Sequence, residues 1–398
     1  MNLQSGLLSQ SRQFGLDLPD YPWETMVPFK SVAAKHPQGL VDLSIGTPVD
    51  ATSDVVREAL IEAANAPGYP GAHGTSSLRE AIVDWFSRRR GVPFLDPDSV
   101  MPTIGSKELI AWLPLMLGLQ PGDVIVRPAT AYPTYDIGAQ LCGAKVVAAD
   151  DLDELDPAVR RRVRLVWINS PANPTGQVHD LARMRTVVAQ AREIGAVVAS
   201  DECYAELGWG QWDTDLVGGE RVPSVLDPRV TEGSTKGLLA TYSLSKQSNL
   251  AGYRAAFVAG DRQIVKDLVN TRKHAGMIVP SPVMAAMEAA LHDDEHVRIQ
   301  KAVYRKRRRL LLPAVKAAGM EVKFSDAGLY LWATAGMDTW ETVRRLAEIG
   351  IVVGPGLFYG AAGEGYIRFS ITASDERVAS AAERLIATGN TLAGASQG

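Results

Sequence analysis

Cysteine is scarce in this chain of 398 residues, which has only two, and neither a Cys-x-x-Cys pair nor a cluster of cysteine and histidine occurs. A disulfide framework and a structural zinc site both need more such residues, so neither is expected. Long apolar runs are also missing. The longest, residues 109–119, falls well short of the roughly 20 residues that span a bilayer. Residues 1–15 lack the basic and then apolar run of a signal peptide, so we predict a cytoplasmic protein without a metal site or a membrane segment.

The chain also has no excess of charge of one sign. Lys and Arg number 41 against 45 Asp and Glu, which gives a formal net charge of −4. A protein that binds nucleic acid through a general positive field, or a membrane through a polybasic segment, needs a surplus of Lys and Arg. The basic run at residues 305–309 lies in a helical pattern and is interpreted as a solvated face. We therefore expect neither nucleic acid nor a membrane as a partner.

What the sequence does contain is typical of a globular protein of two or three domains, with 46% apolar and 22% charged residues. Between about residues 70 and 260, short runs of Val, Ile and Ala alternate with helical patterns, and several runs are apolar throughout, as in strands covered on both faces. We expect strands at 124–126, 145–149, 164–168, 196–200, 238–242 and 255–259, and helices at 53–64, 76–90, 106–119, 133–142 and 180–194. This alternation predicts an α/β domain with a mostly parallel, doubly wound sheet.

The two ends of the chain have a different character. Pro19, Pro22 and Pro28 should interrupt any regular element within residues 1–30. After residue 280 the expected elements are helices at 281–292 and 295–318, antiparallel strands at 321–324, 329–334, 351–353 and 366–371, and a last helix from 375 to about 385. We therefore expect a large domain at residues 50–280 and a smaller α+β domain at residues 281–398. The N-terminal segment, residues 1–49, would join the smaller domain.

Polar and ionisable side chains follow several of the expected strands. In an open parallel sheet, ligands bind beyond the carboxyl ends of the strands. The positions concerned are residues 169–176, 201–204 and 243–246, then Arg254, with Gly105 and Ser106 at the start of the helix at 106–119. Each has an ordinary structural interpretation alone: a single lysine such as Lys246 is usually a solvated surface residue, and Asp201 could be a helix cap. Their occurrence together is what points to a catalytic site.

The order and spacing of four groups of residues resemble the class I/II aminotransferases, which are pyridoxal 5′-phosphate (PLP) enzymes of fold type I. These groups are Asn173-Pro174-Thr175-Gly176, Asp201-x-x-Tyr204, Ser243-x-x-Lys246 with Arg254, and Arg368 within Tyr366-Ile367-Arg368-Phe369-Ser370. The resemblance extends from about residue 46 to the last helix. Residues 21–24, 41–50 and 68–70 further resemble actinobacterial N-succinyldiaminopimelate aminotransferases. The implied fold is the PLP-dependent transferase fold type I.

The resemblance implies that Lys246 binds PLP covalently and later moves a proton between substrate and cofactor. A lysine must be neutral to attack a carbonyl, and burial beside other cations would lower its pKa in the required direction. Asp201 would keep the ring nitrogen protonated, and Tyr204 and Asn173 would hydrogen-bond the 3-oxygen of the cofactor. Lys246, Asp201 and Tyr204 are thus the expected catalytic residues.

A phosphate site is also implied, made of a helix N-terminus, a hydroxyl and a guanidinium. The residues expected to bind the cofactor at this end are Gly105, Ser106, Lys107, Ser243 and Arg254. Tyr132 would stack on the ring of PLP. Tyr69 matches the tyrosine that reaches the phosphate from the neighbouring subunit in this family, so a homodimer with shared active sites is the expected assembly.

Arg368 is expected to clamp the substrate α-carboxylate through two parallel hydrogen bonds, beside Asn173 and the backbone of Gly46. Gly46 could equally be a turn glycine. A distal carboxylate of the substrate could meet Lys107 or His73. The expected substrates are an acidic amino acid and a 2-oxo acid, in the first place N-succinyl-LL-2,6-diaminopimelate and 2-oxoglutarate, as in lysine biosynthesis.

Other functions remain open at this point. A fold type I carbon–sulfur β-lyase, or an aminotransferase for another amino acid, would keep the same cofactor residues. A non-catalytic PLP-binding regulator would usually carry a DNA-binding module, and neither residues 1–45 nor the C-terminus is large or basic enough to be one. A dinucleotide dehydrogenase is disfavoured because no Gly-x-Gly-x-x-Gly follows the first strand of a βαβ unit.

Overall fold

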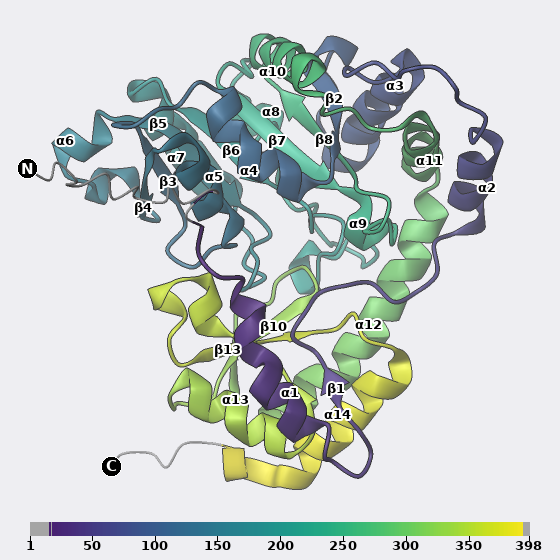
Figure 1. Ribbon diagram of the computed structural model, residues 1–398, viewed down its shortest axis with the longest axis vertical. Coiled ribbons are helices and arrows are strands. Elements are labelled where there is room, and N and C mark those ends of the chain that lie inside the picture. The colour runs from purple at the N-terminus through teal and green to yellow at the C-terminus, as the bar shows by residue number, and fades with distance from the viewer. Residues whose placement is uncertain (1–15, 17, 393–398) are drawn as a thin grey trace, which may run out of the picture.

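The computed structural model describes Leu16 and residues 18–392. These residues form a larger domain on a seven-stranded sheet and a smaller domain on a four-stranded sheet, with the long helix α12 (Asp294–Ala317) running from one to the other (Figure 1). This is the α/β organisation with a second, α+β domain that the sequence predicts. Within the described part of the chain, no helix is both long and apolar enough to cross a membrane.

The sheet of the larger domain has the order β2-β8-β7-β6-β5-β3-β4. Strands β3 to β7 form parallel pairs, whereas β8 pairs antiparallel with both of its neighbours, β7 and β2. The strands are β2 (Val100–Ile104), β3 (Val124–Arg127), β4 (Lys145–Ala148), β5 (Val163–Asn169), β6 (Val197–Asp201), β7 (Leu238–Ser243) and β8 (Ala255–Gly260). The predicted mostly parallel sheet is confirmed, and the six strands expected between residues 124 and 259 are all present.

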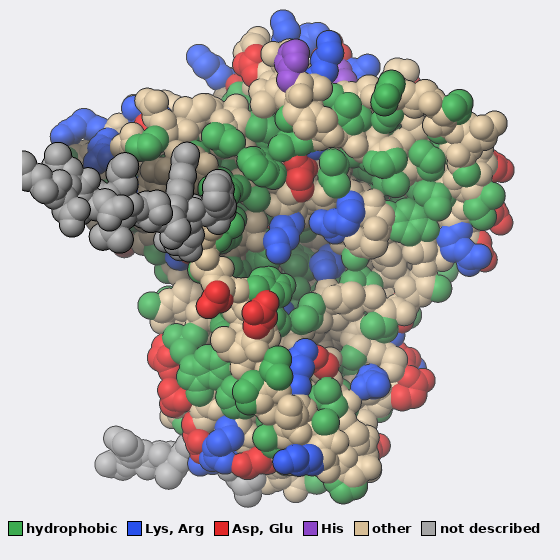
Figure 2. All heavy atoms as spheres, viewed as in Figure 1, with side chains coloured by type: hydrophobic (Ala, Val, Ile, Leu, Met, Phe, Trp, Pro, Cys, Tyr) green, Lys and Arg blue, Asp and Glu red, His purple; other side chains and the backbone are tan. Residues whose placement is uncertain are grey.

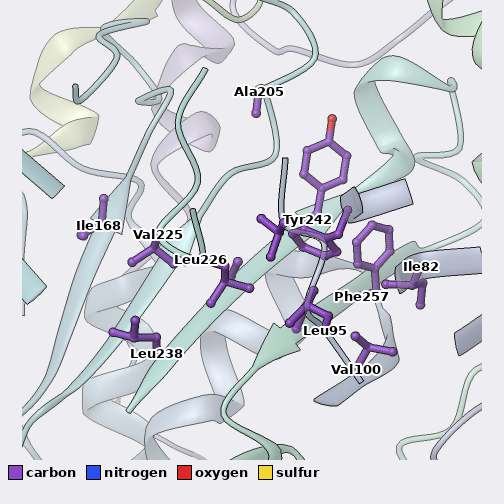
Figure 3. Close-up of a cluster of buried hydrophobic side chains, with 14 of the residues drawn as sticks. Ile82, Leu95, Val100, Ile168, Ala205, Val225, Leu226, Leu238, Tyr242 and Phe257 are labelled. Carbon is purple, nitrogen blue, oxygen red and sulfur yellow. The ribbon is translucent and has the colours of Figure 1, made fainter. Parts of the chain in front are cut away.

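Helices cover both faces of this sheet. One face packs on α2 (Asp54–Glu62), α3 (Ser76–Trp85), α7 (Leu181–Glu193) and α11 (Ser281–His292), and the other on α4 (Ser106–Met116), α5 (Thr134–Cys142) and α10 (Arg262–Ala275). Within β8, Phe257 lies in the first cluster and Val258 in the second, because successive side chains of a strand point to opposite faces. Figure 3 shows part of the first cluster, where Tyr242 and Phe257 stack at 5.6 Å. Burial on both faces explains the apolar runs without alternation.

The smaller domain has an antiparallel sheet of order β12-β13-β10-β9. Its strands are β9 (Glu321–Lys323), β10 (Tyr330–Thr334), β12 (Gly354–Pro355) and β13 (Tyr366–Ser370), and its helices are α1 (Val27–Ala33), α13 (Thr339–Glu348) and α14 (Asp375–Thr388). From the N-terminal segment, β1 (Val41–Asp42) pairs in parallel with β11 (Ile351–Val352). Met26 and Leu43 of the same segment lie in the hydrophobic cluster of this domain.

Short helices complete the described chain. They include the 3₁₀ turn Pro22–Met26, the π-helical turn Phe86–Arg90, α6 (Pro157–Arg160), α8 (Pro228–Thr231) and α9 (Leu244–Gln247), besides several other short 3₁₀ turns. The prediction that prolines leave residues 1–30 irregular is wrong for residues 22–30, while residues 1–15 lie outside the described part. Pro22 and Pro28 occupy the first turns of the 3₁₀ turn and of α1, where the backbone N–H groups have no helical partner and proline costs nothing.

Three further elements were not expected from the sequence. Strand β2 contains Pro102 and lies at the edge of the sheet, the position where a strand tolerates proline. Helices α10 and α13 contain many charged residues, and no helix is expected from the sequence at either place. The expected boundary at residue 280 also differs from the packing, since α11 lies against α2 and α3 and its Met284 and Met287 belong to the core of the larger domain.

Ion pairs hold the two domains to α12. The guanidinium of Arg307, which is buried, donates from Nη1 and Nη2 to the Asp50 carboxylate at 2.8 and 2.6 Å and from Nε to Asp375 at 2.7 Å. Asp50 lies in the segment that leads from the smaller domain to α2, and Asp375 begins α14. One arginine of the long helix thus fixes both the crossover segment and the last helix.

Candidate active site

A cleft of about 960 Å³ lies between the two domains. The larger domain contributes the carboxyl ends of its strands to it, and the smaller domain contributes β10, β13 and the segment 18–23. Figure 2 shows the hollow between the domains, with Lys and Arg side chains in its depth. This is the edge of the sheet at which the sequence predicts a ligand site.

Strand register explains why residues far apart in sequence meet here. Asn169 and Asp201 are register partners at the ends of the parallel strands β5 and β6, and Ser243 ends β7 beside them. Because β8 runs in the opposite direction, its first residue, Ala255, pairs with Ile104 at the end of β2. Arg254, directly before β8, is therefore brought to the same edge as Gly105, directly after β2.

Lys246 lies on α9 and points its ammonium group into the cleft, where Nζ donates a hydrogen bond to the carbonyl oxygen of Gly46. Burial, together with the positive charges of Arg368 and Arg254, lowers the pKa of this amine below its usual value. The direction agrees with the sequence prediction for an amine that must lose its proton to react with a carbonyl.

Asp201 is buried at the floor of the cleft. Its carboxylate accepts hydrogen bonds from the hydroxyl of Tyr135 at 3.2 Å and from the backbone N–H of Cys203 at 3.3 Å. Burial raises the pKa of Asp201, because no cation is paired with it among the ion pairs of the described residues. Cys203 is itself buried, and burial raises the pKa of its thiol well above the usual range, as expected of an unreactive side chain.

Tyr204 and Asn173 lie beside this carboxylate. The hydroxyl of Tyr204 is 3.2 Å from that of Tyr330 on β10. Asn173 is held by a hydrogen bond from its backbone N–H to Oδ1 of Asn169 at 2.8 Å, which leaves its own Oδ1 facing the smaller domain. Both side chains line the cleft, as the sequence predicts.

Hydroxyl and guanidinium groups gather around the N-terminus of α4. Gly105, with φ +77°, is the N-cap of this helix, and a β-carbon there would collide with the guanidinium of Arg254. Ser243 Oγ donates to Ser245 Oγ at 2.8 Å, and Ser106 lines the same end of the cleft. A helix N-terminus with adjoining hydroxyls and a guanidinium is suited to a phosphate group.

Arg368 reaches the cleft from the middle of β13. Its Nη1 donates to Oδ1 of Asn173 at 2.7 Å and its Nη2 to the carbonyl oxygen of Ser44 at 2.6 Å, while its buried Nε has no partner among the described residues. The guanidinium lies over the rings of Tyr330 and Tyr359, at 3.9 and 5.0 Å. Arg368 is thus a buried cation with no carboxylate partner in the part of the chain that the structure describes, and it is available to a carboxylate of a ligand.

Tyr132 and Lys107 form part of the cleft wall on the side of the larger domain. Burial raises the pKa of Tyr132 to about 12, and its ring contacts that of Tyr135 edge-on at 6.2 Å. Lys107 is exposed to the cleft, and its Nζ lies 5.5 Å from the centre of the Tyr21 ring. No ion pair recorded among residues 16 and 18–392 involves Lys107.

The structure brings together all the predicted site residues except Tyr69 and the weaker candidate His73. Tyr69 is fully exposed and is not part of the cleft wall within a single chain. His73, the second candidate for a distal carboxylate, also lies outside the cleft wall. Four residues with polar contacts in the site were not singled out from the sequence: Ser44, Tyr135, Ser245 and Tyr330. Ser245 lies within the Ser243-x-x-Lys246 motif and could have been found there.

Comparison with known families settles the class. The model of the family "aminotransferase class I and II" matches residues 38–385, which is most of the chain. The protein belongs to the class I and II aminotransferases. It is therefore an enzyme that moves amino groups between amino acids and 2-oxo acids with PLP as cofactor. The sequence resemblance to this family is confirmed.

Two curated relatives share about half of their sequence with this aminotransferase. The 4-dedimethylamino-4-oxo-anhydrotetracycline transaminase OxyQ of Streptomyces rimosus is 51% identical over 93% of this chain and 99% of its own. A probable aminotransferase of Mycobacterium tuberculosis is 52% identical over 92% of this chain and 85% of its own. The LL-diaminopimelate aminotransferase of Aquifex aeolicus is more distant, with 34% identity over 92% of this chain and 96% of its own.

Solved structures of aminotransferases superpose on the whole fold. An aminotransferase of Neisseria meningitidis gives a TM-score of 0.85 at 29% identity and covers 94% of this chain and 98% of its own. A probable N-succinyldiaminopimelate aminotransferase of Thermus thermophilus gives 0.81 at 27% identity, over 92% of this chain and 100% of its own.

The side chains of the aminotransferase cleft fit PLP. A buried carboxylate without a cation, Asp201, suits a protonated ring nitrogen, and an amine with a lowered pKa, Lys246, suits a covalent bond to an aldehyde. The concave anion site at Gly105, Arg254 and Ser243 suits the phosphate. These groups lie in one cleft, so a single cofactor molecule could contact all of them.

Proposed function

We propose that this aminotransferase transfers an amino group between N-succinyl-LL-2,6-diaminopimelate and 2-oxoglutarate. The observation that carries the proposal is the pair of cations, Arg368 and Lys107, that line one cleft and have no carboxylate partner in the described chain. A substrate with two carboxylates set apart by several bonds would satisfy both. The roles proposed below for individual residues follow from their geometry.

Arg368 binds the α-carboxylate of the amino acid. It has two terminal nitrogens directed at Asn173 and Ser44, and exchanging one of these neutral acceptors for a carboxylate strengthens the hydrogen bond. Holding the carboxylate fixes the rotation of the substrate about its α-carbon, so that the bond to hydrogen is aligned for cleavage. Gly46 lines the same space, where its missing side chain leaves room for the Tyr330 ring.

Lys246 would hold the cofactor through a covalent bond of its side-chain amine, and the same amine would serve as the base when substrate occupies the cleft. When bound, PLP supplies a conjugated ring that takes up the electron pair left at the α-carbon. Burial and the charges of Arg368 and Arg254 lower the pKa of the Lys246 amine, which favours its neutral form, so the free amine would accept the α-proton and return it as a general acid. Replacing Lys246 with Ala should abolish covalent cofactor binding and leave the fold intact. Full activity in a folded Ala variant would refute this role.

Asp201 would hold the proton of the ring nitrogen, and Tyr135 and the Cys203 N–H orient its carboxylate. Tyr204 and Asn173 would donate hydrogen bonds to the 3-oxygen. Tyr132 would pack against the ring. Gly105, Ser106, Ser243 and Arg254 would bind the phosphate, and Lys107 would add its charge at the same wall of the cleft. These roles would hold the cofactor at three points and keep its ring in one plane.

We further propose a homodimer in the cytoplasm, in which Tyr69 of one subunit completes the phosphate site of the other. The support is the complete exposure of Tyr69, with Val49 and Ile61 nearby in sequence and also exposed. Large exposed apolar side chains of this kind are common at subunit interfaces. Analytical ultracentrifugation at micromolar protein concentration should give a species of twice the chain mass. Tyr69→Phe should lower the affinity for PLP and leave the dimer intact.

The names of the relatives bear on the substrate. The Thermus protein is named for N-succinyldiaminopimelate and the Aquifex protein for LL-diaminopimelate. Both compounds are acidic amino acids with carboxylates far apart, so these names support the proposal. The name of OxyQ, at 51% identity, favours a second candidate, the amination of a ring ketone. In that case the cleft would accept a large, flat substrate and gain little from Lys107.

A screen of amino donors tests the proposal. Each donor is mixed with the PLP-loaded enzyme and 2-oxoglutarate, and glutamate is measured. The donors are N-succinyl-LL-2,6-diaminopimelate, aspartate, alanine, phenylalanine and cystathionine. We expect the succinyl compound to give the highest kcat/KM. Equal or higher kcat/KM for phenylalanine would refute the acidic-substrate proposal, and release of pyruvate and ammonia from cystathionine would indicate a carbon–sulfur lyase instead.

A further inference from the structure

Tyr330 joins two parts of the cleft that come from different domains. It lies on β10 of the smaller domain and is buried, yet its side chain lines the cleft. Its hydroxyl is 3.2 Å from the hydroxyl of Tyr204, and its ring lies 3.9 Å below the guanidinium carbon of Arg368. No other tyrosine in the described chain has both contacts.

The hydroxyl of Tyr330 also lies next to the backbone that binds Lys246. A β-carbon on Gly46 would collide with this hydroxyl, and the carbonyl oxygen of Gly46 accepts the hydrogen bond of Lys246. The groups that face Tyr330 electrostatically are therefore two cations, Arg368 and Lys246, and the more distant carboxylate of Asp201.

These neighbours make the two hydroxyls unequal. Burial alone would raise the pKa of Tyr330, but Arg368, Lys246 and the hydrogen bond with Tyr204 together outweigh it and the net direction is downward. Burial and the contact with Tyr330 raise the pKa of Tyr204 well above the usual range. The more acidic hydroxyl is the better donor and the less acidic one the better acceptor. The favoured arrangement is therefore Tyr330 donating to the oxygen of Tyr204.

We propose that Tyr330 is a positioning residue of this active site, which acts through Tyr204 with its hydroxyl and through Arg368 with its ring. By donating to the Tyr204 oxygen, it leaves the proton of Tyr204 free to point into the cleft, towards the 3-oxygen of PLP. By stacking under the guanidinium, it keeps the plane of Arg368 fixed for a carboxylate. The inference rests on the proposed roles of Tyr204 and Arg368.

Tyr359 provides a natural contrast. Its ring also contacts Arg368, at 5.0 Å, and is buried, but its hydroxyl has no hydrogen-bond partner in the described chain. Removing that hydroxyl takes an oxygen from the same neighbourhood without touching Tyr204. Tyr359→Phe is therefore a matched control for Tyr330→Phe.

The test is a pH titration of the visible absorption of the PLP-loaded enzyme, which reports the proton on the link between Lys246 and the cofactor and needs no turnover. A hydrogen bond from Tyr204 to the 3-oxygen stabilises the negative charge there and favours loss of that proton. We expect Tyr330→Phe to raise the midpoint by about half a pH unit, the size of one neutral hydrogen bond. Tyr204→Phe should raise it further, and the double variant should match Tyr204→Phe alone.

The ring is tested separately. Tyr330→Phe keeps the ring and should leave the KM for glutamate unchanged, whereas Tyr330→Leu should raise it about thirty-fold, the size of a buried cation–π contact. Affinity for PLP, from the quenching of tryptophan fluorescence in the cofactor-free protein, should fall in Tyr204→Phe and less in Tyr330→Phe. Tyr359→Phe should keep the wild-type midpoint.

Three outcomes would overturn the inference. The first is a wild-type midpoint in Tyr330→Phe while Tyr204→Phe is shifted, which would leave Tyr330 a packing residue. The second is additive shifts in the double variant, which would mean that Tyr330 acts independently of Tyr204. The third is a wild-type midpoint in Tyr204→Phe itself, because the proposed role of Tyr204 then fails and the inference fails with it. The assignment of the chain as an aminotransferase would still stand.

Discussion

The guanidinium of Arg254 lies against the α-carbon of Gly105, in the space that a side chain at residue 105 would fill. Arg254 itself has a left-handed backbone, with φ +55°, and Nη1 donates to the carbonyl oxygen of Ala251 at 2.9 Å. The guanidinium and the N-terminus of α4 therefore lie side by side. Both can donate N–H groups to one anion bound at this end of the cleft. A glycine at residue 105 is the condition for this arrangement.

Replacing Gly105 with Ala should lower the affinity for PLP about ten-fold, because Arg254 must move away from the helix N-terminus. The variant should also lose roughly 1 kcal/mol of unfolding free energy, since φ is +77° at this residue. Gly118→Ala is the matched control. Its φ is +78° and a β-carbon added there would have no atom within 4 Å, so it should lose stability and keep PLP affinity. Equal PLP affinity in both variants would contradict the prediction.

Asp201→Asn should stabilise the cofactor-free protein at neutral pH. Burial raises the pKa of this carboxyl in the folded protein above its usual 3.8. A group of this kind contributes most to stability at low pH, and the contribution is lost as the pH rises through the folded-state pKa. The Asn variant should therefore melt at a higher temperature than the wild type at pH 7, and the difference should shrink as the pH is lowered towards 4.

The control for this pH series is Asp213→Asn, which should behave in the opposite way. Asp213 is also buried, but Lys301 at 2.8 Å and Arg305 at 3.0 Å outweigh its burial and lower its pKa. Its contribution is present at neutral pH and is lost as the pH falls. Melting temperatures measured from pH 4 to 8 check both variants, and parallel curves for the two would show that the carboxyl of Asp201 is not a buried, unpaired charge.

Lys107→Met should raise the KM for a dicarboxylic donor such as glutamate about ten-fold and leave that for alanine unchanged, because a single charged contact is lost. Lys107→Arg keeps the positive charge and should recover most of the affinity. If the Met variant instead loses affinity for PLP with no preference among donors, Lys107 belongs to the phosphate site, and the distal carboxylate is bound elsewhere.

Arg307→Met should lower the unfolding free energy by about 3 kcal/mol, because it leaves the partly buried carboxylates of Asp50 and Asp375 without their shared cation. Arg298→Met on the same helix is the control. Its partner Glu295 is exposed, and loss of that pair should produce no measurable change. Chemical denaturation of the PLP-free protein measures both, and similar losses for the two variants would argue against a special role of Arg307.

Much of the larger domain could be predicted because its strands are buried on both faces. The apolar run at 238–242, for example, can be identified as a strand from its own residues alone, because every residue of β7 is buried. Strand β2 could not be found in this way, because Pro102 is a poor strand residue and only its place at the sheet edge makes it acceptable. The helical turns at Pro22 and Pro28 were not predicted for a related reason. Proline is excluded from the interior of a helix, but it is favourable in the first turn.

The candidate site was predictable where its residues follow strands, and not where they depend on the contact between domains. Asn169, Asp201 and Ser243 end neighbouring strands, and this alone places them together. The hydrogen bond between Arg368 and Asn173 joins residues 195 positions apart and needs the docking of two domains. Tyr330 carries no local signal at all, since an aromatic residue in a strand is usually a core residue.

The bond between Arg368 and Asn173 has one more consequence. Arg368 moves with the sheet of the smaller domain, whereas Asn173 follows a strand of the larger one. A substrate carboxylate that binds the Arg368 guanidinium competes with the Asn173 side chain for it. Binding of a substrate would therefore break this hydrogen bond between the two domains. The angle between the domains should then differ between the empty and the substrate-bound enzyme. A ligand without a carboxylate would leave the hydrogen bond between Arg368 and Asn173 intact.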